Sequence, residues 1–442
     1  MREIKKYDIK SPIGFADNLT RYIETLDCGI ILRSNSYLSK KDKHSVRSSY
    51  DFLAGLGAIT IIKHDKDRLE FLRKDFNRIN DWIFGYIGYD IKNEIEQLTS
   101  SNFDGLGFND LFFFQPKIVM NFKEDKLNVK YTPEITPVEE IDALVAKFDY
   151  EIDDFNFTSH IKQFKRRFSK DEYIETVKKI KNHIQQGDIY EMNFCQEFYN
   201  DDATINPAET FIALNRFFPT PFASFLKKGN RYIISASPER FLKKKRETII
   251  SQPIKGTVAR SIDPDEDEHI KENLRNDPKE RAENIMIVDL VRNDLSKIAE
   301  IGSVNVDELC GVYPFRQLYQ MISTISCKIK KDYDFIDVLK ATFPMGSMTG
   351  APKIKAMELI EHFERTKRGL YSGSIGYISP VHDFDLNVVI RTLLYNKDKK
   401  YLSFSVGSAI TINSDPEKEY QECMLKAKAI LTTLKAEIVD AG

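Results

Sequence analysis

The sequence is poor in cysteine and has no long apolar run. Its 442 residues include five cysteines. They are odd in number, widely spaced and form no Cys-x-x-Cys pair, which argues against a disulfide framework or a thiolate metal site. No window approaches the ~18 consecutive apolar residues of a membrane-spanning helix, and the opening MREIKKYDIKSPIG lacks the apolar segment of a secretory signal. We therefore expect reduced thiols, a cytoplasmic location and no membrane contact.

The sequence also lacks an excess of charge of either sign. Its 65 basic and 67 acidic residues give a formal net charge of −2, so there is no bulk attraction to nucleic acid or to an anionic membrane. A small or locally bound partner is expected instead. With 42% hydrophobic residues the chain can bury a large core. Its character changes near residues 150–165, which separates an amino-terminal region, residues 1–150, from residues 165–435.

Residues 169–198 carry the clearest local signals. Ser169-Lys-Asp-Glu172 is a capping box, and apolar residues then recur at helical spacing until Gly187 provides a stop. The pattern predicts a helix that is followed by a strand over residues 189–198.

A lysine follows a strand-like run at an unusual place. Residues 231–241 and 247–257 are predicted to form two strands, and antiparallel pairing would bring Glu239 and Lys255 into the same region of a sheet. One interpretation is that Lys255 extends from a strand end to water, as most lysines in strands do. The other is that Lys255 is a nucleophile, which requires burial or a nearby cation to lower its pKa.

Two pairs of glutamates follow helix-start signals. Asp277-Pro and Asp415-Pro each place a proline at the first helical position. Glu280 and Glu283 lie at i, i+3 in the first helix, as do Glu419 and Glu422 in the second, which places each pair on one helix face. Either pair alone is typical of a solvated face. Together the four carboxylates could hold Mg²⁺, which prefers oxygen ligands.

An arginine interrupts the apolar strand pattern of residues 385–395. The guanidinium of Arg391 must be paired in such a strand, and a carboxylate fits its two-pronged geometry. The partner could be a structural acid or a substrate. Upstream, the glycine-interrupted segment FPMGSMTGAPK (343–353) runs into a helix, where free backbone N–H groups favour an anion.

Taken together, these segments resemble the chorismate-utilising enzymes. The resemblance covers roughly residues 165–430 and rests on several motifs in the family's order: GDIYEMNFCQEF (187–198), SASPERF (235–241), PIKGT (253–257), ERAENIMIVDLVRNDL (280–295), FPMGSMTGAPKIKAME (343–358), YSGSIGY (371–377), IRTLL (390–394) and DPEKEYQEC (415–423). It implies an α+β fold, in which two large antiparallel β-sheets pack as a sandwich with helices outside. Residues 1–150 and 165–435 would form one intertwined unit.

The lysine of PIKGT points to one branch of this family. Aminodeoxychorismate synthases have a lysine there, whereas anthranilate synthases typically have a small residue. By this resemblance Lys255 attacks C2 of chorismate as the 4-hydroxyl leaves, and ammonia then adds at C4 and expels the lysine. Glu239 of SPERF corresponds to the general acid, whose proton burial would retain near neutral pH. The product, 4-amino-4-deoxychorismate, leads to para-aminobenzoate and folate.

The resemblance also assigns the metal and substrate contacts. Glu283 and Glu422 correspond to direct Mg²⁺ ligands, with Glu280 and Glu419 behind them through water. Gln196 lies where relatives that activate water have a lysine, and its amide argues against that chemistry. Tyr371 and Arg391 match a clamp on the enolpyruvyl carboxylate, and backbone near Gly407 and Ser408 would approach the ring carboxylate. The full substrate-binding set comprises Gly256, Thr257, Ser347, Thr349, Gly350, Tyr371, Arg391, Gly407, Ser408 and Gln196.

Some features depart from the family pattern or leave alternatives open. Gln320 replaces a histidine of many relatives, and the element tied to tryptophan feedback is absent near SNSYLS (34–39). No cysteine lies in a glutaminase nucleophile turn, so a separate glutaminase subunit would supply ammonia. The alternatives are anthranilate synthesis with an incidental lysine, and a non-catalytic chorismate-binding subunit. Retention of Lys255, Glu239 and all four glutamates makes the second the weaker, because a pure binder needs no nucleophile.

Overall fold

The computed structural model describes residues 2–35, 49–150 and 155–440. Its helices are α1 (Pro12–Thr25), α2 (Arg68–Ile79), α3 (Lys92–Ile95), α4 (Val138–Phe148), α5 (Lys170–Gln186), α6 (Pro207–Phe217), α7 (Pro264–Asn276), α8 (Pro278–Ser296), α9 (Phe335–Thr342), α10 (Lys353–Phe363) and α11 (Pro416–Leu434), with 3-10 turns η1 (Tyr89–Ile91) and η2 (Gly346–Met348). Its strands are β1 (Glu3–Asp8), β2 (Cys28–Arg33), β3 (Phe52–Ile62), β4 (Ile83–Ile87), β5 (Leu111–Lys123), β6 (Lys126–Tyr131), β7 (Gln163–Arg166), β8 (Glu191–Asn200), β9 (Phe222–Lys228), β10 (Arg231–Ser237), β11 (Arg240–Lys245), β12 (Thr248–Gln252), β13 (Ile254–Ala259), β14 (Asn305–Pro314), β15 (Leu318–Lys328), β16 (Gly350–Ala351), β17 (Ser374–Ile378), β18 (Phe384–Val388), β19 (Thr392–Asn396), β20 (Tyr401–Ile410) and β21 (Glu437–Asp440). The predicted α+β class is confirmed.

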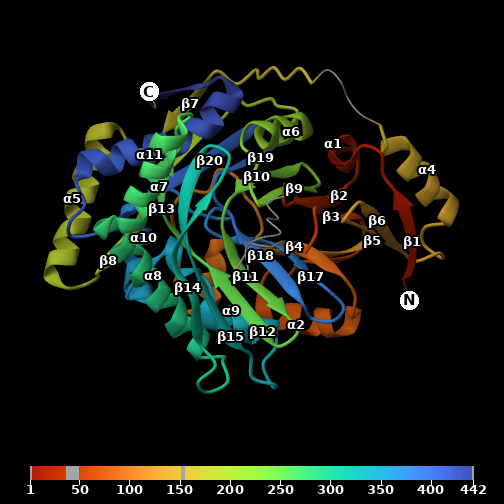
Figure 1. Ribbon diagram of the computed structural model, residues 1–442, viewed down its shortest axis with the longest axis horizontal. Coiled ribbons are helices and arrows are strands. Elements are labelled where there is room, and N and C mark those ends of the chain that lie inside the picture. The colour runs from red at the N-terminus through yellow and green to blue at the C-terminus, as the bar shows by residue number, and fades with distance from the viewer. Residues whose placement is uncertain (1, 36–48, 151–154, 441–442) are drawn as a thin grey trace.

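Strand pairing runs without a break from one end of the sheet to the other, and Figure 1 shows β4 of the amino-terminal region beside the later strand β17. The pairing passes from β14 through β15, β12, β11, β18, β17, β4, β5, β3, β2, β9, β10, β19, β20 and β8 to β7 and β21. Strands β2 and β4 of the amino-terminal region pair antiparallel with β9 and β17. The first 150 residues and the later ones therefore share one set of hydrogen bonds.

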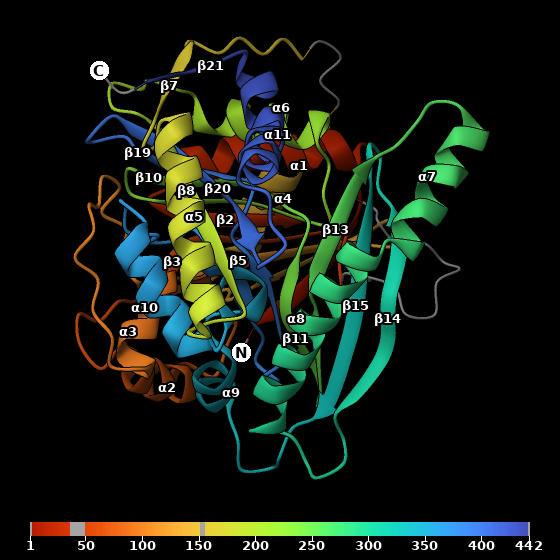
Figure 2. The ribbon, with the colours of Figure 1, turned by 90° about the vertical axis from the view of Figure 1, so that its left-hand side faces the viewer.

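The core is divided by the alternation of side chains along the strands. On β2, Ile30 faces a cluster contributed almost entirely by strands, whereas Ile31 faces a second cluster beneath helices. This largely strand-borne cluster joins β2, β3, β9 and β10 to β4, β5 and β17, so it lies between two layers of sheet. Helices cover the outer faces: α1, α4, α5, α6, α10 and α11 over one, and α2, α8 and α9 over the other (Figure 2).

The helix predictions from capping signals are confirmed. In α5, Ser169 and Glu172 form the reciprocal capping box, and Gly187 ends the helix in the left-handed region with φ 85°. The carboxylates of Asp277 and Asp415 cap α8 and α11, each followed by the predicted proline. The glutamate pairs therefore lie in the first two turns of long helices.

Three runs that the sequence predicts as single strands are divided. Residues 231–241 and 247–257 each break into two strands, β10 with β11 and β12 with β13. Residues 385–395 contain most of β18 and β19, and the chain turns between them at Arg391, whose φ is 50°. Arg391 thus lies at a strand junction rather than within a strand.

No helix within the described ranges combines the length and the apolar character needed to cross a bilayer.

Four residues of the SNSYLS segment (36–39) lie outside the described residues.

Candidate active site

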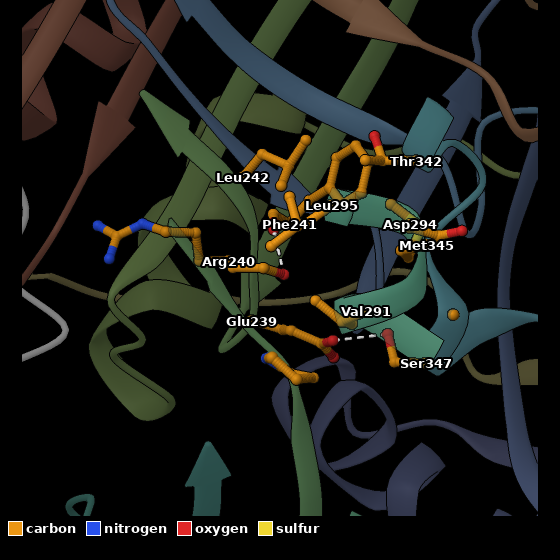
Figure 3. Close-up of a pocket in the computed structure, with 13 residues that line it drawn as sticks. Glu239, Arg240, Phe241, Leu242, Val291, Asp294, Leu295, Thr342, Met345 and Ser347 are labelled. Carbon is orange, nitrogen blue, oxygen red and sulfur yellow. Dashed lines mark hydrogen bonds between the residues drawn. The ribbon is translucent and has the colours of Figure 1, made fainter. Parts of the chain in front are cut away.

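Glu239 is buried between β10 and β11. The residue is only 4% exposed, and its Oε1 accepts a hydrogen bond from Ser347 Oγ at 2.6 Å. Burial raises the pKa of Glu239 to about 7, against the opposing effects of Ser347 and Lys255. Figure 3 shows Glu239 and Ser347 pointing toward each other, while Arg240 extends in the opposite direction. Glu239 is therefore a carboxyl group that can hold and release a proton near neutral pH.

Antiparallel pairing brings Lys255 close to Glu239, as the sequence predicts. Strands β11 and β12 pair with Arg240 opposite Gln252, and the backbone N–H of Ile254 donates a hydrogen bond to Glu239. Lys255 follows directly on β13, and its positive charge acts on the Glu239 carboxyl. A proton donor at the junction of β10 and β11 and an amine on β13 are thus close enough for the charge of one to act on the other.

The Lys255 ammonium is paired rather than isolated. Its Nζ lies 3.2 Å from Oε1 of Glu191, at the start of β8, and its side chain is 12% exposed. Burial lowers the pKa of Lys255, but the carboxylates of Glu191 and Glu283 outweigh burial and raise it overall. The interpretation that Lys255 extends to water is therefore wrong. The pKa shift that we expected for a nucleophile also has the opposite sign.

The two glutamate pairs approach each other across α8 and α11. Lys279 Nζ lies 3.7 Å from Glu283 Oε1 and 3.9 Å from Glu419 Oε1. Burial raises the pKa of Glu283 to about 7, and it also raises that of Glu280. For Glu422 burial is outweighed by Lys426, at 2.7 Å, so its pKa is lowered.

The glutamates fit a hard cation by their chemistry. Among the described residues no group of three histidine, cysteine, aspartate or glutamate side chains lies close enough to hold a metal ion. However, Mg²⁺ commonly takes one or two protein carboxylates and fills its remaining positions with water and substrate oxygens. Burial disfavours the charged form of Glu280 and Glu283, and a bound divalent cation would stabilise that form.

Gly256 and Thr257 flank Lys255 in different ways. Gly256 has φ 91°, and a Cβ there would lie 3.2 Å from Oε2 of Glu280, so glycine suits both the conformation and the close approach. Thr257 is exposed and pairs with Gln320 of β15. Gly256 therefore brings the strand that carries Lys255 against the first glutamate pair.

The segment from Ser347 to Gly350 packs tightly against β8. Asn193 donates its Nδ2 to the carbonyl of Ser347 at 3.2 Å and its backbone N–H to that of Thr349 at 2.8 Å. The Thr349 hydroxyl bonds within its own loop, to the carbonyl of Met345 at 3.2 Å. A Cβ on Gly350 would overlap the carbonyl oxygen of Glu191. Ser347 offers its hydroxyl to the site, whereas that of Thr349 is used locally.

Gly407 of β20 allows a similarly close approach from the other side of β8. A Cβ there would overlap Cys195 Sγ and the carbonyl oxygen of Phe194. The neighbouring Ser408 is buried with its hydroxyl 3.4 Å from that of Tyr173. At Gly407 the backbone of β20, rather than a side chain, therefore packs against β8.

Tyr371 and Arg391 differ in how far their polar groups are satisfied. The Tyr371 hydroxyl lies 3.5 Å from Cys195 Sγ. Burial lowers the pKa of Arg391, and the charge of Glu239 partly offsets this effect. The Arg391 guanidinium forms no ion pair or hydrogen bond with the residues that the structure describes. Arg391 lines a cavity with Gln320, whose buried Oε1 also has no partner among those residues. A structural acid for Arg391 is therefore not found there.

The family description "chorismate binding enzyme" matches residues 34–432. The chain belongs to this family. The probable aminodeoxychorismate synthase, chloroplastic, of Oryza sativa subsp. japonica is 34% identical over 84% of the chain but only 46% of its own length. The aminodeoxychorismate synthase component 1 of Bacillus subtilis (strain 168) is 31% identical over 79% of the chain and 76% of its own length.

A solved structure of the family has the same fold. Anthranilate synthase component I from Streptococcus pneumoniae TIGR4 aligns with a TM-score of 0.76 and 27% identity, covering 89% of this chain and 96% of that one. The chain spans less than half the length of the rice relative. The family thus includes relatives named for two different reactions.

Two polar side chains of β8, those of Glu191 and Gln196, lie on opposite faces of the strand. Gln196 is buried with its Nε2 3.5 Å from Cys423 Sγ, on the opposite strand face from Glu191, so the structure does not bring it to Lys255. Glu191, which is not among the site residues predicted from the sequence, is the residue of β8 that lies beside Lys255. Alternation along EMNFC, which puts Glu191, Asn193 and Cys195 on one face, is the signal that could have identified it.

Proposed function

We propose that this protein converts chorismate and ammonia to 4-amino-4-deoxychorismate. The observation that carries the proposal is the placement of Lys255 beside Glu239, a buried carboxyl whose pKa is raised to about 7. This pairing of an amine nucleophile and a proton donor suits a displacement in which a hydroxyl group leaves. Relatives named aminodeoxychorismate synthase support it.

The reaction would proceed in two displacements. The neutral amine of Lys255 forms a bond to C2 of chorismate, the ring double bond shifts, and the C4–O bond breaks as Glu239 gives its proton to the departing hydroxyl, which leaves as water. Ammonia then forms a bond to C4, the double bond shifts back, and the C2–N bond breaks to release the Lys255 amine. An ammonium ion supplies both the ammonia and the proton that restores Glu239.

Mg²⁺ would be held near α8 and α11. Glu283 and Glu422 are the proposed direct ligands, with Glu280 and Glu419 acting through water. When bound, the ion supplies positive charge for the ring carboxylate of the substrate. The crowding of these carboxylates around Lys279 supports this assignment.

The remaining residues would orient chorismate. Arg391, whose guanidinium forms no ion pair within the described ranges, is the proposed anchor for the enolpyruvyl carboxylate, and Tyr371 is its proposed second contact. The backbone at Gly256, Gly350 and Gly407 is proposed to line the ring. The other proposed contacts are Thr257, Ser347, Thr349 and Ser408.

Ammonia would come from a separate glutaminase subunit. The name component 1 of the Bacillus relative is consistent with a second component. All five cysteines are buried, and burial raises the pKa of Cys195 to about 11, which makes its thiol a poor nucleophile. The proposed product serves para-aminobenzoate and folate synthesis.

The test is product identification by mass and absorbance. The purified chain is incubated with chorismate, Mg²⁺ and a high concentration of ammonium, and pyruvate is assayed in parallel. Aminodeoxychorismate without pyruvate is the expected result. Lys255→Ala should bind chorismate and Mg²⁺ but lose most product formation, whereas Lys244→Ala, on the neighbouring β11, should behave as the parent. Full activity of Lys255→Ala would refute covalent catalysis.

Anthranilate synthesis is the second candidate, because the chain shares its fold with an anthranilate synthase component I. Release of anthranilate with pyruvate in the same incubation would establish it and make Lys255 incidental to the chemistry.

A further inference from the structure

Glu191 is the partner of Lys255 and one of the most deeply buried acids near the site. The residue is 1% exposed. Its Oε1 lies 3.2 Å from Lys255 Nζ, whereas its Oε2 is buried without a hydrogen-bond partner among the described residues. A buried ion pair that serves stability alone is expected to have its remaining lone pairs satisfied. The bare oxygen therefore indicates another role.

The backbone on both sides of Glu191 fixes where its carboxylate lies. β8 pairs with β20 through most of its length and with β16, where Ala351 is opposite Glu191. Gly350 approaches the Glu191 carbonyl so closely that a Cβ would overlap it. The same loop carries Ser347, which donates to Glu239. One loop thus contacts both the residue that pairs with the amine and the residue that would give the proton.

Glu191 is also the nearest of the negative charges that act on Lys255. Glu283 on α8 and Glu422 on α11 also act on the Lys255 ammonium, but neither lies within 4.0 Å of Lys255 Nζ. Glu239 acts on Lys255 from the junction of β10 and β11. Glu283 and Glu422 are the proposed metal ligands, so their charge would be engaged when the metal is present. Glu191 then remains as the counter-charge of the amine.

We propose that Glu191 is a positioning residue for Lys255: its carboxylate fixes Nζ on the side of Glu239 and, as the nearest negative charge, determines how readily the ammonium gives up its proton. This inference rests on the proposed function for its catalytic consequence. Its effect on the amine itself does not depend on the reaction.

The first experiment measures the amine directly. Lys255 is labelled by reductive methylation across a range of pH. The extent of methylation is measured by mass spectrometry of the peptide that contains Lys255. In Glu191→Gln the amide oxygen still accepts a hydrogen bond but the charge is gone, so the labelling midpoint should move to lower pH by about one unit or more. Glu197→Gln is the matched control, because Glu197 lies on the same face of β8 and pairs with Arg167 and Tyr401 instead.

The second experiment separates position from charge during turnover. Glu191→Ala should lower kcat by about tenfold or more while changing KM for chorismate little. Glu191→Gln should retain kcat at alkaline pH, with the acid limb of its pH profile moved to lower pH. Circular dichroism and thermal unfolding establish that each variant is folded. If Glu191→Ala does not fold, the comparison of Glu191→Gln with the parent decides.

The two proposals fail in different ways. A labelling curve of Glu191→Gln that coincides with that of the parent would overturn the inference, as would full kcat in Glu191→Ala. Absence of aminodeoxychorismate from the parent would overturn the proposed function alone, because the labelling shift of Lys255 would still be observed.

Discussion

Replacing Glu239 with glutamine should make the protein more stable while inactivating it. A carboxyl whose pKa rises from 4.5 to about 7 on folding binds more protons in the folded than in the unfolded state between these values. Stability therefore falls as the pH rises through this range. Above pH 7 the accumulated cost is about 3 kcal/mol. Glutamine is neutral at every pH and can still accept the hydrogen bond from Ser347, so Glu239→Gln avoids this cost.

The assay is urea unfolding of the parent and of Glu239→Gln at pH 5 and pH 8. The advantage of the variant in free energy of unfolding should grow by about 2.5 kcal/mol between these two values. Turnover should fall by about 10²- to 10⁴-fold, because an amide cannot give a proton to the leaving hydroxyl. Glu134→Gln, at an exposed turn residue, is the control and should change stability by no more than about 0.5 kcal/mol.

An advantage of Glu239→Gln that is equal at both pH values would refute the reasoning, because the penalty would then not arise from ionisation. A variant that is less stable at pH 8 would refute it more strongly. Normal turnover would remove Glu239 from its role as acid, whatever the stability data show.

Two further predictions concern the metal and the packing of β8. Glu283→Gln should weaken Mg²⁺ binding by about tenfold or more in calorimetric titration. The control is Glu358→Gln, at an exposed residue. A Glu283→Gln titration equal to that of the control would contradict the assignment of Glu283 as a metal ligand. Gly407→Ala should lower the free energy of unfolding by about 1–3 kcal/mol, because its Cβ would overlap Cys195 Sγ and neighbouring backbone; an unchanged melting temperature would show that β8 and β20 can separate there.

The sequence was most informative where local chemistry decides the structure. Helices α5, α8 and α11 begin where Ser169, Asp277 and Asp415 can cap them, since a cap depends only on residues within one turn. The approach of Glu239 to Lys255 also followed, because a short turn between strands limits how far apart they can lie.

The features that depend on distant segments could not be predicted. The break at Arg391 depends on how β18 and β19 pair with β11 and β10, and these strands lie about 150 residues earlier in the chain. The ion pair of Lys255 with Glu191 joins residues 64 apart, and its effect on the amine reverses the one expected from burial alone.

The unbroken strand pairing has a consequence during synthesis of the chain. Ile87 of β4 pairs with Ser374 of β17, so the ribosome must add nearly three hundred residues before that edge of β4 meets its partner. At ordinary translation speeds this takes roughly 15–60 s. Throughout that interval an apolar strand edge is available to other chains. The yield of active protein in a cell should therefore depend on how well nascent chains are kept apart, as well as on the stability of the finished fold.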